Sequence, residues 1–151
     1  MTDARQSFLD EWIPVQVKTG LDMHSGDPAS WIDAWSHGEP VSVFGAGVRA
    51  RTGWTDVSRT IHWVAGRFAD CATYDYELVA ADAHGDMAYT CGFERYTATR
   101  PNGDVIVNEL RVTQIYRRED GTWKLVHRHG DHPPSDPTDE RTEAGRRQEP
   151  Q

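Results

Sequence analysis

The chain has 151 residues, which is the size of one domain with one hydrophobic core. Its net charge of −8 argues against a nucleic-acid-binding protein, because that function requires clustered Lys and Arg. No apolar run approaches the ~18 residues of a membrane span, and the start of the chain lacks the apolar core of a signal peptide, so we expect a cytoplasmic protein.

Helical signals occupy the first part of the chain. Apolar residues recur at helical spacing over residues 3–24, and Pro14 within them predicts a kink or a helix that restarts there. Asp27 and Pro28 are typical of a helix start and predict a second helix over residues 28–36, with Trp31 and Trp35 one turn apart.

A short strand and a third helix follow. The stretch VSVFGAG predicts a strand that ends in glycines. The stretch GWTDVSRTIHWVAGRF predicts a helix capped by Thr55, because its apolar residues recur on one face.

The pattern changes to β-structure after Cys71. Alternating residues predict four strands, at about 73–82, 86–100, 105–118 and 123–131, joined by turns at HG, PNGD and EDGT. Helices followed by an antiparallel meander indicate an α+β fold, in which three helices pack on one face of a curved, mostly antiparallel sheet. Residues 133–151 carry no large apolar residue, so we expect one domain over residues 1–132 and a disordered acidic and polar tail over 133–151.

This order of elements resembles the nuclear transport factor 2-like superfamily of cone-shaped α+β barrels, which includes ketosteroid isomerase. The chain is most similar to SnoaL-like domain proteins, through GDPASWIDAWS, VSVFGA, the GW that opens the third helix, and LRVTQIYRREDGTWKLVHRHGD. The resemblance implies a mostly apolar pocket inside the cone and a homodimer. It does not fix the reaction, because the superfamily contains isomerases, cyclases, dehydratases and proteins without known chemistry.

Strand alternation predicts which polar groups line that pocket. Trp123, Leu125, His127 and His129 share one face of the last strand, so we expect both imidazoles to point inward and Arg128 outward. A type I turn at EDGT with Gly121 left-handed adds Arg111 and Thr113 to the histidine face.

The turn at PNGD leaves two registers open. A two-residue turn at Asn102 and Gly103 places Glu94 opposite Arg111. A type I turn that Pro101 opens, with Gly103 left-handed, places Arg95 opposite Glu109. Both registers form a charge pair, so charge complementarity does not choose between them.

The candidate catalytic set is therefore His129, His127, Arg111, Thr113 and Glu94. One histidine would act as the base, and Arg111 with Thr113 would stabilise an enolate oxygen. Candidate substrate-binding residues are Trp35, Trp54, Trp63, Trp31, Phe44 and His62.

Several other chemistries lack support in the sequence. The histidines near the end of the chain have no HExxH or Cys/His partner, so we expect no metal site. Cys71 and Cys91 lack CxxC spacing, and no GxSxG motif or nucleotide loop occurs. The Asp and Tyr set of ketosteroid isomerase does not map onto this chain.

The leading hypothesis is a cofactor-independent isomerase, cyclase or dehydratase that acts by proton transfer on a hydrophobic, oxygen-bearing small molecule. Two alternatives use the same fold. One is a non-catalytic domain that binds a small ligand, and the other is a dimerising domain whose pocket is filled by side chains.

Overall fold

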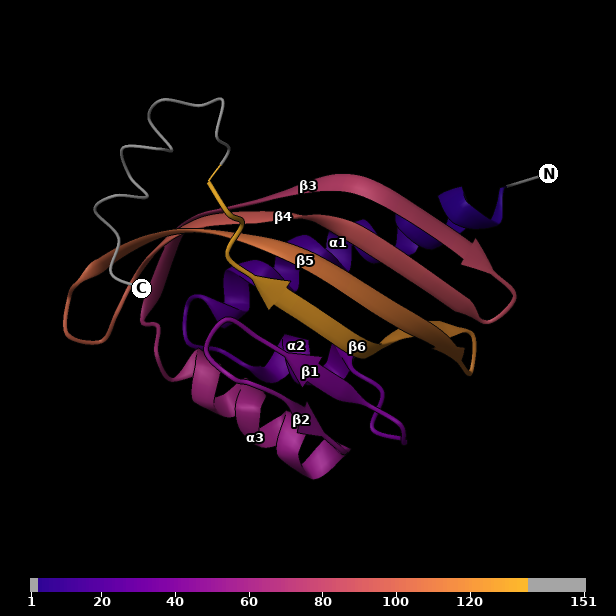
Figure 1. Cartoon of the computed structure of the whole chain (residues 1–151), viewed down its shortest axis with the longest axis horizontal. Coiled ribbons are helices and arrows are strands. Elements are labelled where there is room, and N and C mark those ends of the chain that lie inside the picture. Colours follow the sequence, from indigo (N-terminus) through magenta and orange to yellow (C-terminus); the bar gives the residue numbers. More distant parts are fainter. Residues whose placement is uncertain (1–2, 136–151) are drawn as a thin grey trace.

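A computed structural model of the chain describes residues 3–135. Helices α1 (Ala4–Met23), α2 (Ala29–Ala34) and α3 (Trp54–Ala65) pack against one sheet. Its strands are β1 (Ser42–Phe44), β2 (Arg51–Thr52), β3 (Asp70–His84), β4 (Met87–Thr99), β5 (Val105–Glu119) and β6 (Thr122–Asp131). Figure 1 shows the long strands curving over the helices, which confirms the predicted cone-shaped α+β fold, although the sheet is not closed. The tail predicted at 133–151 lies, from residue 136 on, outside the described residues.

Helix α1 forms the longest part of the helical layer. The Asp3 carboxylate caps it by accepting a hydrogen bond from the N–H of Arg5. The helix continues through Pro14 instead of restarting there, because its buried face continues on both sides of the proline. That face contains Phe8, Leu9, Trp12, Gln16, Thr19, Gly20 and Met23.

The connection from α2 to α3 differs from the prediction in two details. Helix α2 has only six residues, where the sequence pattern indicated about nine. Helix α3 begins at Trp54, and its first N–H donates to the Glu39 carboxylate, so the prediction that Thr55 caps this helix was wrong. A side chain distant in sequence supplies the acceptor, which local sequence signals do not reveal.

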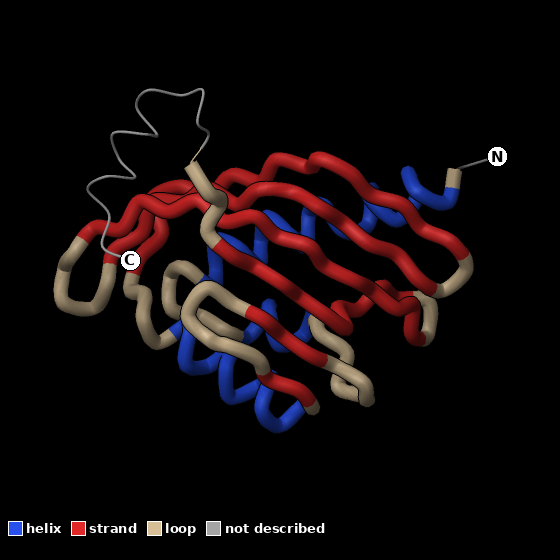
Figure 2. Tube along the Cα trace, in the orientation of Figure 1, coloured by secondary structure: helices blue, strands red, loops and turns tan. Residues whose placement is uncertain are grey.

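The sheet has the strand order β2-β1-β6-β5-β4-β3. All neighbouring strands are antiparallel except β1 and β6, which run parallel. Figure 2 shows the sheet as one curved layer with the helices on its concave side. The inner side chains of the sheet therefore face the helices, and the outer ones face away from them.

The turn at residues 100–104 settles the register of β4 and β5. Gly103 has a φ of +92°, and Arg95 lies opposite Glu109, as the type I alternative predicted. Glu94 then lies opposite Leu110 on the inner face.

The last hairpin differs from the predicted type I turn. Asp120 and Gly121 both have positive φ values, and Glu119 pairs with Thr122 across a two-residue turn of type I′. Further along β6, Tyr116 pairs with Leu125 but Ile115 pairs with His127, so Val126 is an extra residue that forms a β-bulge. The bulge reverses which face each later residue of β6 occupies.

Gly20 allows α1 to approach the sheet closely. A Cβ at this position would lie 2.2 Å from the Tyr74 ring. Alanine favours helix by about 1 kcal/mol over glycine, but we expect Gly20→Ala to lower the free energy of unfolding by roughly 1–3 kcal/mol, because the contact is too short. Urea unfolding measures this change. Gly38→Ala is the control, since its Cβ would make only an ordinary contact at 3.7 Å, and an equal effect of the two substitutions would contradict the packing argument.

Candidate functional site

A cavity of about 420 Å³ lies between the three helices and the inner face of the sheet. This volume is in the range of small-molecule sites, and most of the wall is apolar. Its apolar side chains include Met23, Trp31, Trp35, Val57, Ile61 and Leu110. The alternative of a dimerising domain whose pocket is filled by side chains does not fit this geometry.

An ion pair lies on the sheet side of the cavity. Arg128 Nη2 donates to Glu94 Oε1 at 2.5 Å, and Arg128 Nη1 donates to Gln114 Oε1 at 2.7 Å. Glu94 is only 2% exposed, and the Arg128 side chain is 15% exposed. A guanidinium has five N–H donors, so Arg128 retains donors without a partner among the described residues, beside the cavity.

A buried hydrogen-bond network orients the Glu94 carboxylate. Tyr74 donates its hydroxyl proton to Glu94 Oε2 at 2.5 Å, and Gln16 Nε2 donates to the same oxygen at 3.1 Å. Gln16 Oε1 accepts from Gln114 Nε2 at 2.9 Å, which connects the helix side of the network to the sheet. The network satisfies buried polar groups and fixes their orientation.

The ion pair keeps both partners charged. Burial by itself would raise the pKa of Glu94, but the charge of Arg128 and the hydrogen bonds from Arg128 and Tyr74 hold this pKa below its ordinary value. Burial would lower the pKa of Arg128, but Glu94 raises it above the ordinary value. The cavity therefore contains a fixed cation and a fixed anion.

His24, at the end of α1, lies in the cavity wall. Its Nδ1 lies 2.6 Å from the Gly20 carbonyl oxygen, which can only accept, so Nδ1 carries the proton and Nε2 of the neutral ring is the basic nitrogen. Burial lowers the pKa of His24, and Arg128 adds to this effect, while Glu94 and the Gly20 contact oppose it. The imidazole is therefore neutral at pH 7.

Tyr96 stacks on His24, with ring centroids 3.8 Å apart. Its hydroxyl oxygen accepts a hydrogen bond from Asn108 Nδ2 at 2.8 Å, and both residues line the cavity. Burial is the largest cause that raises the pKa of Tyr96, so the hydroxyl keeps its proton at neutral pH. Tyr96 is thus a hydrogen-bond donor next to a neutral base.

The wall of the cavity therefore combines a base (His24), a neutral donor (Tyr96) and a cationic donor (Arg128). Such a set can remove a proton from carbon and stabilise the negative charge that develops on a neighbouring oxygen.

The prediction that His127 and His129 point inward was wrong. Neither lines the cavity, and the His129 side chain is 50% exposed. His127 Nδ1 lies 2.7 Å from the Ser42 hydroxyl, and the ring of Phe44 contacts both imidazoles from the outer side. The bulge at Val126 is the cause, because after it Arg128 takes the inner face that unbroken alternation assigns to the histidines.

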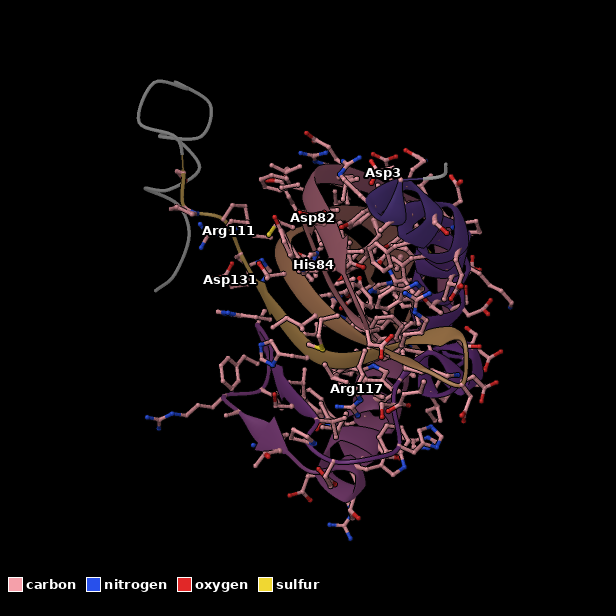
Figure 3. The ribbon with its side chains drawn as sticks, turned by 90° about the vertical axis from the view of Figure 1, so that its right-hand side faces the viewer. Asp3, Asp82, His84, Arg111, Arg117 and Asp131 are labelled. Carbon is pink, nitrogen blue, oxygen red and sulfur yellow. The ribbon has the colours of Figure 1, made fainter. Side chains whose placement is uncertain are left out.

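Arg111 and Thr113 share the outer face with the histidines. Thr113 pairs with His129 and Arg111 with Asp131, so the predicted grouping of these side chains was correct, but it lies away from the cavity. Figure 3 shows Arg111 and Asp131 together on the outside of the sheet, where they form a partly exposed ion pair at 2.9 Å. Glu94 is the one member of the predicted catalytic set in the cavity wall.

Three of the six predicted substrate-binding residues line the cavity, namely Trp31, Trp35 and Trp63. Trp35 is buried, and its Nε1 has no hydrogen-bond partner among the described residues. Trp54 stacks instead on His37, with ring centroids 4.0 Å apart. Phe44 lies on the outer face, and His62 is exposed on α3; these positions correct the predictions for Trp54, Phe44 and His62.

Sequence reasoning missed His24, Tyr96 and Arg128 as cavity residues. His24 follows the first helix, and a single histidine at a helix end does not by itself indicate a cavity residue. Tyr96 could have been found, because it lies two residues after Glu94 on the same strand and alternation places both on one face. Arg128 could not, because its orientation depends on the bulge.

Two further findings concern residues 3–135. No group of three or more His, Cys, Asp or Glu side chains in this range is arranged to hold a metal ion. None of the helices there combines the length and the apolar character that crossing a membrane requires.

A family model described as a SnoaL-like domain matches residues 21–133 of the chain. No curated protein sequence matches the chain at a significant level.

Several solved structures have the same fold. One is a proposed dehydratase from Streptomyces avermitilis, with 17% identity, a TM-score of 0.72, and coverage of 85% of this chain and 98% of that one. A second is a nuclear transport factor 2-like superfamily protein from Salmonella enterica, with 17% identity, a TM-score of 0.71, and coverage of 89% and 97%. A third is a ketosteroid isomerase-like protein from Erwinia carotovora, with 15% identity, a TM-score of 0.67, and coverage of 82% and 95%. At these identities the likeness concerns the fold.

Proposed function

The chain belongs to the SnoaL-like domain family, and we propose that it is an enzyme. The proposed enzyme isomerises, cyclises or dehydrates a hydrophobic, oxygen-bearing small molecule by proton transfer. The observation that carries the proposal is the neutral His24 imidazole, which lines an apolar cavity together with Tyr96 and Arg128 and whose Nε2 is the unprotonated nitrogen. The names of two structural relatives, a proposed dehydratase and a ketosteroid isomerase-like protein, agree with this reaction class.

In the proposed reaction, His24 Nε2 removes a proton from a carbon atom next to a carbonyl group, and the electron pair moves onto the carbonyl oxygen. The unpaired N–H groups of Arg128 and the hydroxyl of Tyr96 donate hydrogen bonds to that oxygen. The His24 imidazolium then returns the proton to another carbon. Alternatively, the enolate electron pair breaks the bond to a β-hydroxyl group, which takes the imidazolium proton and leaves as water. Glu94 keeps Arg128 in place and does not take part in proton transfer, because its lowered pKa makes it a weak base.

Proton exchange tests this function without a known substrate. The protein is incubated in D₂O with a panel of cyclic ketones and β-hydroxy ketones, and loss of α-proton signals is followed by NMR. Enzyme-dependent exchange or loss of water supports the proposal. Saturable binding of these compounds with no exchange would instead favour the ligand-binding alternative.

We also propose that the protein is a homodimer that pairs through the outer face of the sheet. Phe44 and Tyr89 are exposed large rings on this face, and Ile115 lies next to His127 there. We expect Phe44→Glu combined with Ile115→Glu to convert the dimer to a monomer in sedimentation velocity, because apolar burial would be replaced by like charges. Arg59→Glu, at an exposed position of α3, is a surface control. A wild-type protein that sediments as a monomer would contradict the proposal.

A further inference from the structure

The mouth of the cavity carries positive charge in a protein that is acidic as a whole. The exposed side chains in its lining include Trp63, Arg67, Arg100 and His132. The net charge of the chain is −8, yet the single carboxylate in the cavity lining is Glu94, which Arg128 already neutralises. The charge at the mouth is therefore opposite in sign to the charge of the protein.

The two arginines come from different elements that meet at one end of the cone. Arg67 follows α3, and Arg100 follows β4. Figure 1 shows the end of α3 and the β4–β5 hairpin on the same side of the molecule. Because field lines concentrate in a hollow lined by charges of one sign, this arrangement attracts anions toward the cavity.

Neither guanidinium has its N–H groups paired by the described part of the chain. Neither makes a side-chain hydrogen bond or ion pair within residues 3–135, in contrast to Arg95, Arg111, Arg117 and Arg128. The neighbouring carboxylates of Arg100, Asp70 opposite Thr99 and Asp104 in the hairpin, do not line the cavity. Both cations therefore remain available to a ligand.

Arg67 is held in position at the mouth. Its guanidinium carbon lies 4.9 Å from the centroid of the Trp63 ring. Its Nη1 also lies close to Gly47, because a Cβ added to this glycine would be only 3.2 Å away. Its charge also acts inside the cavity, where it partly offsets the effect of burial, the largest cause, on the pKa of Tyr96. Guanidinium groups bind carboxylates with paired, charge-assisted hydrogen bonds.

We infer that the substrate is an apolar molecule with one carboxylate, which binds Arg67 and Arg100 at the mouth while the apolar body lies among Trp31, Trp35 and Leu110. This inference rests on the proposed function and specifies its substrate class. It also gives the direction of binding, because the carboxylate stays at the mouth and the opposite end reaches His24.

Two dyes with nearly the same aromatic body test the inference. 8-Anilinonaphthalene-1-sulfonate carries one negative charge, and N-phenyl-1-naphthylamine carries none. We expect the double variant Arg67→Gln/Arg100→Gln to bind the anionic dye roughly five- to tenfold more weakly, with unchanged affinity for the neutral dye. Rising salt should weaken binding of the anionic dye to the wild type but not to the double variant. Arg59→Gln, also on α3 but outside the cavity, should behave like the wild type in both measurements.

A second measurement identifies the acidic group. We expect 1-naphthoate to displace the anionic dye from the wild type at lower concentration than uncharged 1-naphthamide, and the double variant to abolish this difference. If the double variant loses affinity for both dyes equally, or for neither, the carboxylate inference is overturned. Failure of the neutral dye to bind the wild-type protein would instead contradict the open apolar cavity on which the proposed function rests, so the two failures are distinguishable.

Discussion

Replacing His24 with Gln is expected to reduce proton exchange by at least about 100-fold, because a positioned general base contributes roughly 10²–10⁴-fold to such a reaction. Glutamine is close in size and polar, but it has no basic nitrogen. The NMR exchange assay measures the loss, and circular dichroism with thermal unfolding verifies that the variant folds. Variants His127→Gln and His129→Gln are matched controls, since both imidazoles lie outside the cavity.

The pH dependence of exchange separates a catalytic His24 from a structural one. A base must be neutral to act, and burial lowers the pKa of His24 below its ordinary value of 6.5. We therefore expect activity to rise with pH through a limb below 6.5 and to be fully present at pH 7. Full activity in His24→Gln, or loss of activity in the His127 and His129 controls, would contradict the assignment of the base.

Replacing Arg128 with Met is expected to lower the free energy of unfolding at pH 7 by about 3–5 kcal/mol, because it leaves the buried Glu94 carboxylate without its cation. Urea unfolding followed by tryptophan fluorescence measures the change. Arg111→Met is the matched control, since Arg111 is an arginine of the same sheet in a partly exposed ion pair, and we expect little change in its stability.

The direction in which the free energy of unfolding changes with pH follows from the pKa of Glu94. In the wild type its pKa is lowered, so its contribution to stability is present above its ordinary pKa of 4.5 and is lost as pH falls through the lower folded value. Without Arg128, burial dominates and raises this pKa above 4.5, so the folded state takes up a proton that the unfolded state releases. The stability deficit of Arg128→Met should therefore be smaller at pH 4.5 than at pH 7.

A second substitution tests whether the unpaired charge is the cause. Glu94→Gln in the Arg128→Met background removes the charge while keeping a group that can accept from Tyr74. We expect the double variant to be more stable than Arg128→Met alone at pH 7. A deficit that is the same at both pH values, and that Glu94→Gln does not reduce, would show that lost packing and not charge explains the effect.

The Arg128 prediction, and the use of His127 and His129 as controls for His24, depend on one local feature that sequence patterns do not reveal. Unbroken alternation along β6 predicts inward histidines, but the extra residue Val126 exchanges the two faces beyond it. The histidines therefore lie beside Phe44 on the outer face, and Arg128 reaches Glu94 on the inner one. The predicted turn type was also wrong, yet the bulge restored the predicted grouping of Arg111 and Thr113 with the histidines.

The sequence by itself determined the α+β class, the order of helices and long strands, and the family, because these follow from hydrophobic periodicity and turn residues that act over a few positions. It also put Glu94 and three cavity tryptophans among its candidates, but the register that paired Glu94 with Arg111 was wrong, since Glu94 lies opposite Leu110. The tertiary structure alone decided which polar groups meet, since His24, Tyr96 and Arg128 come from a helix and two strands. Their meeting depends on the bulge, on strand register and on the approach of α1 at Gly20, which are set by contacts between residues distant in sequence.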